Sequence, residues 1–131
     1  MGLVLFDADN DGDLDLYIAT GGYEYAPNGP GYEDKLYLND GKGNFTLNKT
    51  TLPRNFASKS CVRAIDYDND GDLDLFIAGR VFPWNYPRPV SCAIYRNDSK
   101  DGKIIFTDVT SRIATPLLNI GMVCDAIWTD L

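Results

Sequence analysis

The chain has 131 residues, of which 44% are hydrophobic and 24% are charged. This composition argues against a disordered chain, and the length fits one domain or a section of a larger one. The formal net charge is −7, but ten of the nineteen acidic residues lie in two short segments, so the acidity is local. We expect no nucleic-acid partner, because there is no basic stripe, and no membrane insertion, because no apolar run approaches about 18 residues.

Histidine is absent, which removes the commonest general base and the commonest transition-metal ligand. The cysteines are Cys61, Cys92 and Cys124, and no two of them have Cys-x-x-Cys spacing, so we expect no zinc site. Their odd number leaves at least one without a partner inside the chain. Buried free thiols that act as small hydrophobic side chains are the simplest interpretation.

Short apolar segments separated by turn residues predict β-strands in the first half of the chain. Residues 14–20 carry apolar side chains on both faces, which predicts a strand covered on both sides. A loop rich in Gly, Pro and Tyr follows over residues 21–34. The predicted strands are residues 3–6, 14–20, 35–39 and 44–48, with a hairpin turn at residues 40–43.

The link between the first two predicted strands is the acidic segment Asp7-Ala8-Asp9-Asn10-Asp11-Gly12-Asp13-Leu14-Asp15. Five carboxylates in nine residues repel one another unless a cation lies among them. Oxygen ligands at alternate positions, with Gly at the sixth, are typical of a loop that binds a hard cation such as Ca²⁺. An EF-hand is excluded, because its loop requires a bidentate Glu at position twelve, where this chain has Ile18.

The same order of elements recurs in the second half of the chain. The acidic segment returns as Asp66-Tyr67-Asp68-Asn69-Asp70-Gly71-Asp72-Leu73-Asp74, which argues against a merely solvated acidic turn. Further strands are predicted at residues 61–65, 73–78, 93–97 and 104–109, with an aromatic, Pro-rich loop at 79–91 and a turn at 98–103. Residues 126–130 parallel the start of the second copy. We therefore divide the chain into repeat 1 (3–60), repeat 2 (61–122) and the first strand of a truncated third repeat (123–131).

Four short antiparallel strands per repeat, apolar on both faces, predict an all-β protein built from β-propeller blades, because each blade then covers its neighbour. A stacked β-solenoid fits less well, since its repeats are usually shorter and contain fewer turns. Known propellers have about 4 to 8 blades, so we expect the remaining blades to come from the parent chain or from self-association.

The sequence resembles the FG-GAP/VCBS repeat of integrin-α-type propellers, and especially the repeats of secreted and surface proteins of bacteria. The resemblance rests on the acidic segments, on Leu-Tyr-Leu-Asn-Asp-Gly at residues 36–41 and on Asn-Phe-Thr at 44–46. It implies two structural Ca²⁺ ions per chain and an extracellular, cell-surface or periplasmic location. It also implies as ligands the side chains at loop positions one, three, five and nine and the backbone carbonyl at position seven. These are Asp7, Asp9, Asp11, Asp15 and the carbonyl of Asp13, then Asp66, Asp68, Asp70, Asp74 and the carbonyl of Asp72.

The predicted topology also indicates a second surface. In a four-stranded meander the acidic loops, as first turns, lie at one end of the sheet, and the second turns lie at the opposite end. The second turns are rich in aromatic residues, which suit recognition of a protein or a carbohydrate ligand; the alternative is that these rings pack the rim of the propeller. The residues are Tyr23, Tyr25, Tyr32, Phe82, Trp84 and Tyr86.

No nucleophile motif, phosphate-binding loop or dinucleotide fingerprint is present, and every close pair of carboxylates lies inside an acidic segment. We therefore expect a non-enzymatic, calcium-binding propeller segment that acts in recognition or adhesion. The alternative is the propeller part of a calcium-dependent, lyase-like enzyme that acts on polysaccharides, which would need an open position on the ion.

Overall fold

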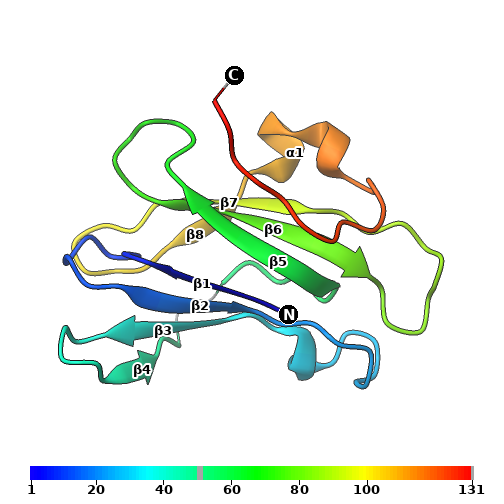
Figure 1. Ribbon diagram of the computed structural model, residues 1–131, viewed down its shortest axis with the longest axis horizontal. Coiled ribbons are helices and arrows are strands. Elements are labelled where there is room, and N and C mark those ends of the chain that lie inside the picture. The colour runs from blue at the N-terminus through cyan, green and yellow to red at the C-terminus, as the bar shows by residue number, and fades with distance from the viewer. Residues whose placement is uncertain (50–51, 131) are drawn as a thin grey trace.

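The computed structural model describes residues 1–49 and 52–130, and its strands form two antiparallel sheets (Figure 1). The first sheet contains β1 (Gly2–Phe6), β2 (Asp15–Ala19), β3 (Lys35–Asn39) and β4 (Phe45–Leu47). The second contains β5 (Ser58–Ile65), β6 (Asp74–Val81), β7 (Ala93–Asn97) and β8 (Phe106–Asp108). In each sheet the strands lie in chain order, so the prediction of an all-β chain with four-stranded meanders is confirmed.

The two sheets have matching registers, which makes the repeat visible in three dimensions. Leu3 lies opposite Ile18 in the first sheet, as Val62 lies opposite Ile77 in the second. The last pair of strands matches as well, with Asn39 opposite Phe45 and Asn97 opposite Phe106. Each residue of the first sheet therefore has an equivalent in the second.

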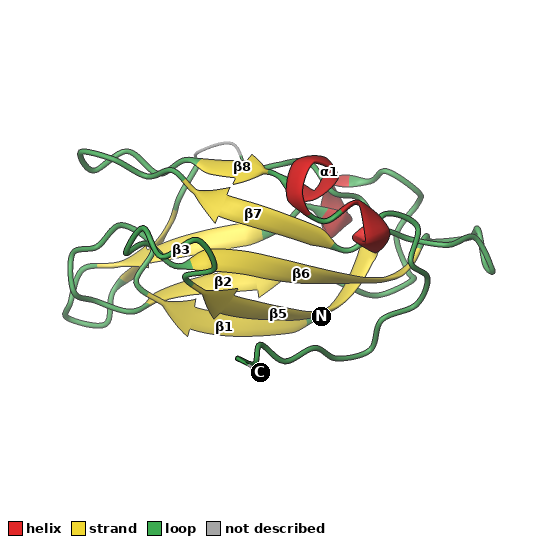
Figure 2. Ribbon diagram, turned by 90° about the horizontal axis from the view of Figure 1, so that it is seen from above, coloured by secondary structure: helices red, strands yellow, loops and turns green. Residues whose placement is uncertain are grey.

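The two sheets lie one over the other (Figure 2). The main core of buried side chains contains residues of both sheets and lies between them. Tyr17 and Ala19 of β2 point into this core and are fully buried, whereas Leu16 and Ile18 on the other face are only half-buried. The sequence predicted cover on both faces of this strand, but no second layer lies on the outer face of the first sheet among the described residues. The buried core residues are Phe6, Ala8, Tyr17, Ala19, Leu36, Val62, Leu75, Ile77, Ala93, Tyr95, Ile104 and Phe106.

The outer face of the second sheet is partly covered by the chain that follows β8. This chain contains a short helix, α1 (Thr110–Ile113), and a 3₁₀ turn, η2 (Thr115–Leu117), neither of which the sequence predicted. Another 3₁₀ turn, η1 (Pro30–Tyr32), lies in the loop before β3. From the end of η2 the chain crosses β5 and β6. Leu117 of η2, together with Val123 and Ala126 after it, packs against buried side chains of the sheet.

The first strand predicted for the third repeat (123–131) is absent from its described residues, since 123–130 form no strand. A strand needs a hydrogen-bonded neighbour, and no described segment pairs with this one. Its position nevertheless repeats that of β5. The amide of Val123 donates to the carbonyl of Gly79 over 3.0 Å, as the amide of Lys59 donates to the carbonyl of Thr20 over 3.0 Å at the equivalent place between the two sheets.

The remaining residues of the chain, 50, 51 and 131, lie outside the described part, so repeat 1 (3–60) and the third repeat (123–131) are not covered in full. All three cysteines are free, and Cys61 and Cys92 are buried while Cys124 is exposed. No helix in the described ranges has the length and apolar character needed to cross a membrane.

Candidate metal centre

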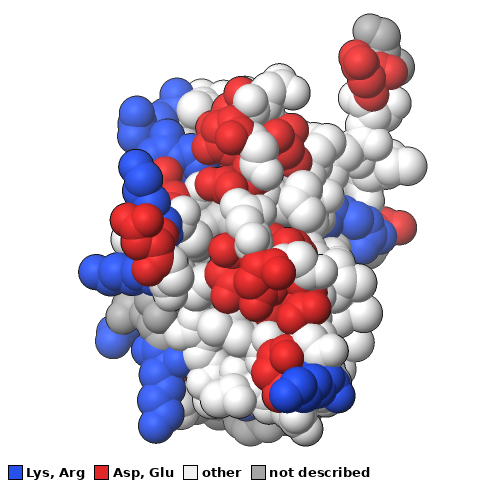
Figure 3. Space-filling view, turned by 90° about the vertical axis from the view of Figure 1, so that its left-hand side faces the viewer, with Lys and Arg blue, Asp and Glu red and all other residues white. Residues whose placement is uncertain are grey.

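The two acidic loops lie side by side at one end of the paired sheets. They connect β1 to β2 and β5 to β6, at the left of Figure 1. Figure 3 views the molecule from this end and shows two neighbouring clusters of acidic side chains in the middle of the face. The side-chain amide of Asn10 in the first loop donates to Asp72 Oδ1 in the second, so the loops are in direct contact.

The loops adopt the same backbone conformation. Asn10 and Asn69 both have φ of 61°, and Gly12 and Gly71 have φ of 94° and 99°. Residues that carry a Cβ are strained in this left-handed region. This explains Gly at the sixth position and, at the fourth, Asn, which adopts a positive φ more readily than most other residues. The closely matching φ angles indicate that the two loops have the same fold.

The first carboxylate of each loop binds the loop's own backbone. Asp7 accepts hydrogen bonds from the amides of Asp11 (3.2 Å) and Gly12 (3.0 Å). Asp66 accepts the equivalent bonds from Asp70 (3.1 Å) and Gly71 (3.0 Å). These bonds wrap the chain around the first carboxylate and bring further carboxylates of the loop near it, although Asp11 and Asp68 remain exposed.

The last carboxylate of each loop is buried. Asp15 and Asp74 are both 0% exposed. Asp15 accepts from the amides of Ala8 and Asn39, each over 2.8 Å. Asp74 accepts from the amides of Tyr67 (3.2 Å) and Asn97 (2.8 Å). Two backbone donors therefore orient each of these carboxylates.

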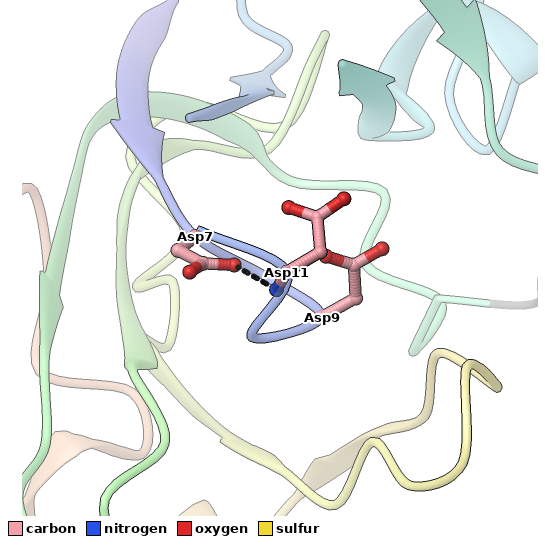
Figure 4. Close-up of side chains that lie close together, drawn as sticks. All are labelled: Asp7, Asp9 and Asp11. Atoms are coloured by element: carbon pink, nitrogen blue, oxygen red, sulfur yellow. Dashed lines mark hydrogen bonds between the residues drawn. The ribbon is translucent and has the colours of Figure 1, made fainter. Parts of the chain in front are cut away.

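The structure brings together part of each predicted ligand set. Oxygen atoms of Asp7, Asp9 and Asp11 lie within 4.8 Å of one another, and Figure 4 shows the carboxylates of Asp9 and Asp11 side by side. In the second loop the equivalent group is Asp66, Asp68 and Asp74. The other predicted side-chain ligands, Asp15 and Asp70, fall outside these two groups.

The electrostatics of the loops fit a cation. Burial raises the pKa of Asp9, and the neighbouring carboxylates of Asp15 and Asp11 raise it further. Burial also raises the pKa of Asp15, and it raises the pKa of Asp74 to about 6. Asp9 Oδ1 is buried and has no hydrogen-bond partner within residues 1–49 and 52–130. A buried carboxylate oxygen without a donor is costly unless a cation binds it, so the residues present suit a metal ion.

A comparison with protein families matches residues 7–77, more than half of the chain, to the FG-GAP-like repeat. The chain belongs to this family. The matched range begins at the first acidic loop, includes all of the second and ends in β6. No curated protein and no solved structure matches the chain.

The aromatic loops lie at the opposite end of the FG-GAP-like repeats, as the meander topology predicts (Figure 1). Tyr23, Trp84 and Tyr86 are exposed, by 44%, 61% and 68%, and Trp84 Nε1 donates to the carbonyl of Tyr23 over 3.3 Å. These three residues, which we call the aromatic cluster, thus come from both repeats. Trp84 has φ of 62°, a left-handed conformation that is unusual for a bulky residue.

The other candidate aromatic residues take part in packing. Tyr32 is fully buried, and its hydroxyl donates to the carbonyl of Tyr25 over 3.0 Å. Tyr25 is 54% exposed, and its ring meets that of Tyr32 edge to face with centroids 5.7 Å apart. Phe82 is half-buried, and the guanidinium of Arg88 lies 4.8 Å from its ring centroid. These contacts hold the loops in shape.

Sequence reasoning missed two groups of buried polar residues. One is Lys59, which is 0% exposed and forms a salt bridge with Asp34 over 3.1 Å beneath the aromatic loops. Nothing in the sequence marked this Lys as buried. The other is Asn97, which forms hydrogen bonds with both acidic loops. The sequence shows that Asn97 is equivalent to Asn39 in the first repeat. Nothing in the sequence pattern indicated that Asn97 connects the two loops.

Proposed function

We propose that the chain is a calcium-binding propeller segment in which two Ca²⁺ ions have a structural role. The observation that carries the proposal is the buried, unpartnered oxygen of Asp9 within a carboxylate cluster whose backbone conformation recurs in the second loop. Hard cations such as Ca²⁺ take about 6 to 8 oxygen ligands, and alternating Asp residues with a backbone carbonyl supply that chemistry.

Each ion would be held by one loop. The first ion would be held by the side chains of Asp7, Asp9, Asp11 and Asp15 and the carbonyl of Asp13. The second would be held by the side chains of Asp66, Asp68, Asp70 and Asp74 and the carbonyl of Asp72. When bound, the ions offset the repulsion among the carboxylates, which otherwise favours opening of the loops.

Elemental analysis and thermal melting test this proposal. We expect two equivalents of calcium after dialysis against micromolar Ca²⁺ and a lower melting temperature in EDTA, because an ion that binds only the native state stabilises it by mass action. Asp9→Asn and Asp68→Asn should each remove one equivalent. A chain that retains no calcium, or melts at the same temperature with and without EDTA, would contradict the proposal.

We further propose that the segment acts in recognition of a protein or carbohydrate ligand as part of a surface or secreted protein. Repeats of this family typically occur in extracellular or surface proteins. The aromatic cluster supports this proposal, because rigid, exposed aromatic side chains provide large contact areas at small conformational cost. The proposal assigns the ions to stability and the opposite end of the sheets to the ligand, and it involves no catalytic step.

A further inference from the structure

A chain of three buried hydrogen bonds connects the two acidic loops. In the first loop, Ala8 donates its amide to Asp15 Oδ2 over 2.8 Å. The carbonyl of Ala8 accepts from the side-chain amide of Asn97 over 3.1 Å. The backbone amide of Asn97 donates to Asp74 Oδ1 of the second loop over 2.8 Å. Because none of these four residues is more than 1% exposed, water does not compete for these bonds.

The path joins groups that the proposed ions would hold. Asp15 and Asp74 are the last carboxylates of their loops, and Ala8 lies between Asp7 and Asp9 in the chain. Ordering of the first loop therefore fixes the Ala8 peptide groups, which fix the side chain of Asn97. Asn97 in turn positions Asp74, so the order of one loop affects the other through covalent and hydrogen-bonded contacts alone.

The equivalent residue of the first repeat provides an internal comparison. Asn39 donates its backbone amide to Asp15 over 2.8 Å, as Asn97 does to Asp74. Its side-chain amide, however, donates to the carbonyl of Leu14 within its own repeat over 3.2 Å. Asn39 faces the outer side of the first sheet, so it has no neighbouring loop to bind among the described residues. The link is thus a property of Asn97 and of the contact between repeats.

We propose that the two loops bind their cations with positive cooperativity and that Asn97 is the positioning residue that couples them. This inference rests on the proposed calcium function. Without an ion, repulsion among the carboxylates loosens a loop and, through Ala8 and Asn97, leaves the other loop less well ordered. The first ion then removes part of the ordering cost of the second, which is a coupling free energy between two sites.

Whether the second ion binds more tightly or more weakly than the first distinguishes coupling through Asn97 from charge repulsion alone. Two bound cations repel each other, so electrostatics alone predicts that the second ion binds more weakly than the first. The contact from Asn10 to Asp72 lies on the surface, where water competes for the same groups. Positive cooperativity therefore requires a structural connection.

Calorimetric titration of CaCl₂ into the metal-free chain, in about 0.15 M salt to screen long-range charge, tests the inference. One loop is disabled by Asp9→Asn with Asp11→Asn, and the other by Asp68→Asn with Asp70→Asn. Each pair removes two negative charges, which equals the charge that a bound divalent cation adds. The intact loop of each variant thus has nearly the same electrostatic surroundings as in the loaded chain.

We compare the Ca²⁺ affinity of one loop in two chains: the variant in which the other loop is disabled, and the unchanged chain in which the other loop holds Ca²⁺. We expect the affinity in the disabled variant to be at least about 5-fold weaker, within the usual range of coupling. Asn97→Ala should abolish this difference, while the matched variant Asn39→Ala should retain it. Equal affinities in the intact and disabled chains would overturn the coupling and leave the calcium function standing. A difference that persists in Asn97→Ala would overturn the role of Asn97, and this variant's two-site binding also reports that it has folded. Absence of any binding would overturn the calcium function itself.

Discussion

The carboxylate of Asp74 makes the chain sensitive to pH. Burial raises its pKa to about 6, and the charges of Asp68 and Asp70 act in the same direction. In the unfolded chain the pKa of Asp is about 3.9, so the folded, metal-free protein binds this proton more tightly. Protonation therefore stabilises the metal-free fold, and this contribution is lost as the pH rises from about 4 through 6.

Calcium reverses this dependence, because the ion binds only the ionised carboxylate. We expect the metal-free protein to melt at a higher temperature at pH 5 than at pH 7, and the calcium-loaded protein to show the opposite order. Calcium affinity at the second loop should fall up to about tenfold for each pH unit below 6, since one proton competes with the ion. Calorimetry and thermal melts at both pH values measure these effects. If the melting temperature changes with pH in the same way with and without calcium, the role of Asp74 as a calcium ligand is contradicted.

Lys59 contributes to stability through a buried ion pair rather than through the core. Its ammonium group contacts Asp34 Oδ1 over 3.1 Å and donates to the carbonyls of Tyr32 (2.5 Å) and Asn55. Burial lowers the pKa of Lys59, and the charge of Asp34 opposes this change. The pair ties β5 of the second repeat to the aromatic loop of the first.

Removal of one partner leaves the other charge buried. We expect Lys59→Met to lower the free energy of unfolding by about 3–5 kcal/mol, as is typical of broken buried pairs. The double variant with Asp34→Asn should lose less than the sum of the two single variants, because it leaves no unpaired charge. Urea unfolding measures all three. Strictly additive losses would show that the two residues do not interact.

At the scale of elements, the sequence was most informative where the pattern was periodic. Residues 35–39 and 93–97 were predicted with their exact bounds, because alternating apolar residues end there at turn residues. The length of β5 was underestimated, since Ser58, Lys59 and Ser60 carry no apolar signal and gain strand structure only from pairing with β6. Tertiary contact determined these positions, and local sequence did not.

The candidate metal centre was predictable for a related reason. Regular Asp spacing and the Gly at position six encode the loop conformation locally, so both copies were found. The contacts between the loops were not found, because Asn97 and Ala8 lie 89 residues apart and meet only when the sheets pack. The positions of the aromatic residues in the second turns were predictable, but their exposure was not. Tyr32 is buried by packing that no local pattern reveals.

The aromatic cluster provides a prediction for the loops at the end opposite the metal centre. Replacement of Trp84 and Tyr86 should abolish binding on a glycan or protein array while the calcium-dependent melt stays unchanged, because both side chains are mostly exposed. Trp84→Asn is preferable to Trp84→Ala, since Asn tolerates the positive φ of 62°. Ile105→Ala, in the β7–β8 turn, serves as the control. A loss of stability without a specific loss of binding would favour a packing role.

At the scale of the whole molecule, the outer face of the first sheet is an apolar surface that no segment within residues 1–49 and 52–130 covers. Leu3, Leu5 and Phe45 are exposed by 58%, 55% and 45%. The equivalent residues Val62 and Phe106 of the second sheet are buried against the first sheet. Since the register is the same in both repeats, the outer face has the shape and composition that already docks one sheet onto another.

We propose that a further blade of the same kind, from the parent chain or from a second copy, covers this face. The outer face of the first sheet in one copy can pack against the outer face of the second sheet in another copy, so copies of the chain can associate head to tail.

Light scattering on the 131-residue chain should show a mass above 14.5 kDa that increases with concentration. Leu3→Gln with Leu5→Gln should reduce this association, because it removes exposed apolar surface from the β1 side of the face. Tyr86→Gln should not, since Tyr86 is 68% exposed and lies in the loop at the end of the sheets, outside this face. A monodisperse monomer of 14.5 kDa at all concentrations would refute self-association and leave the parent chain as the source of the blade.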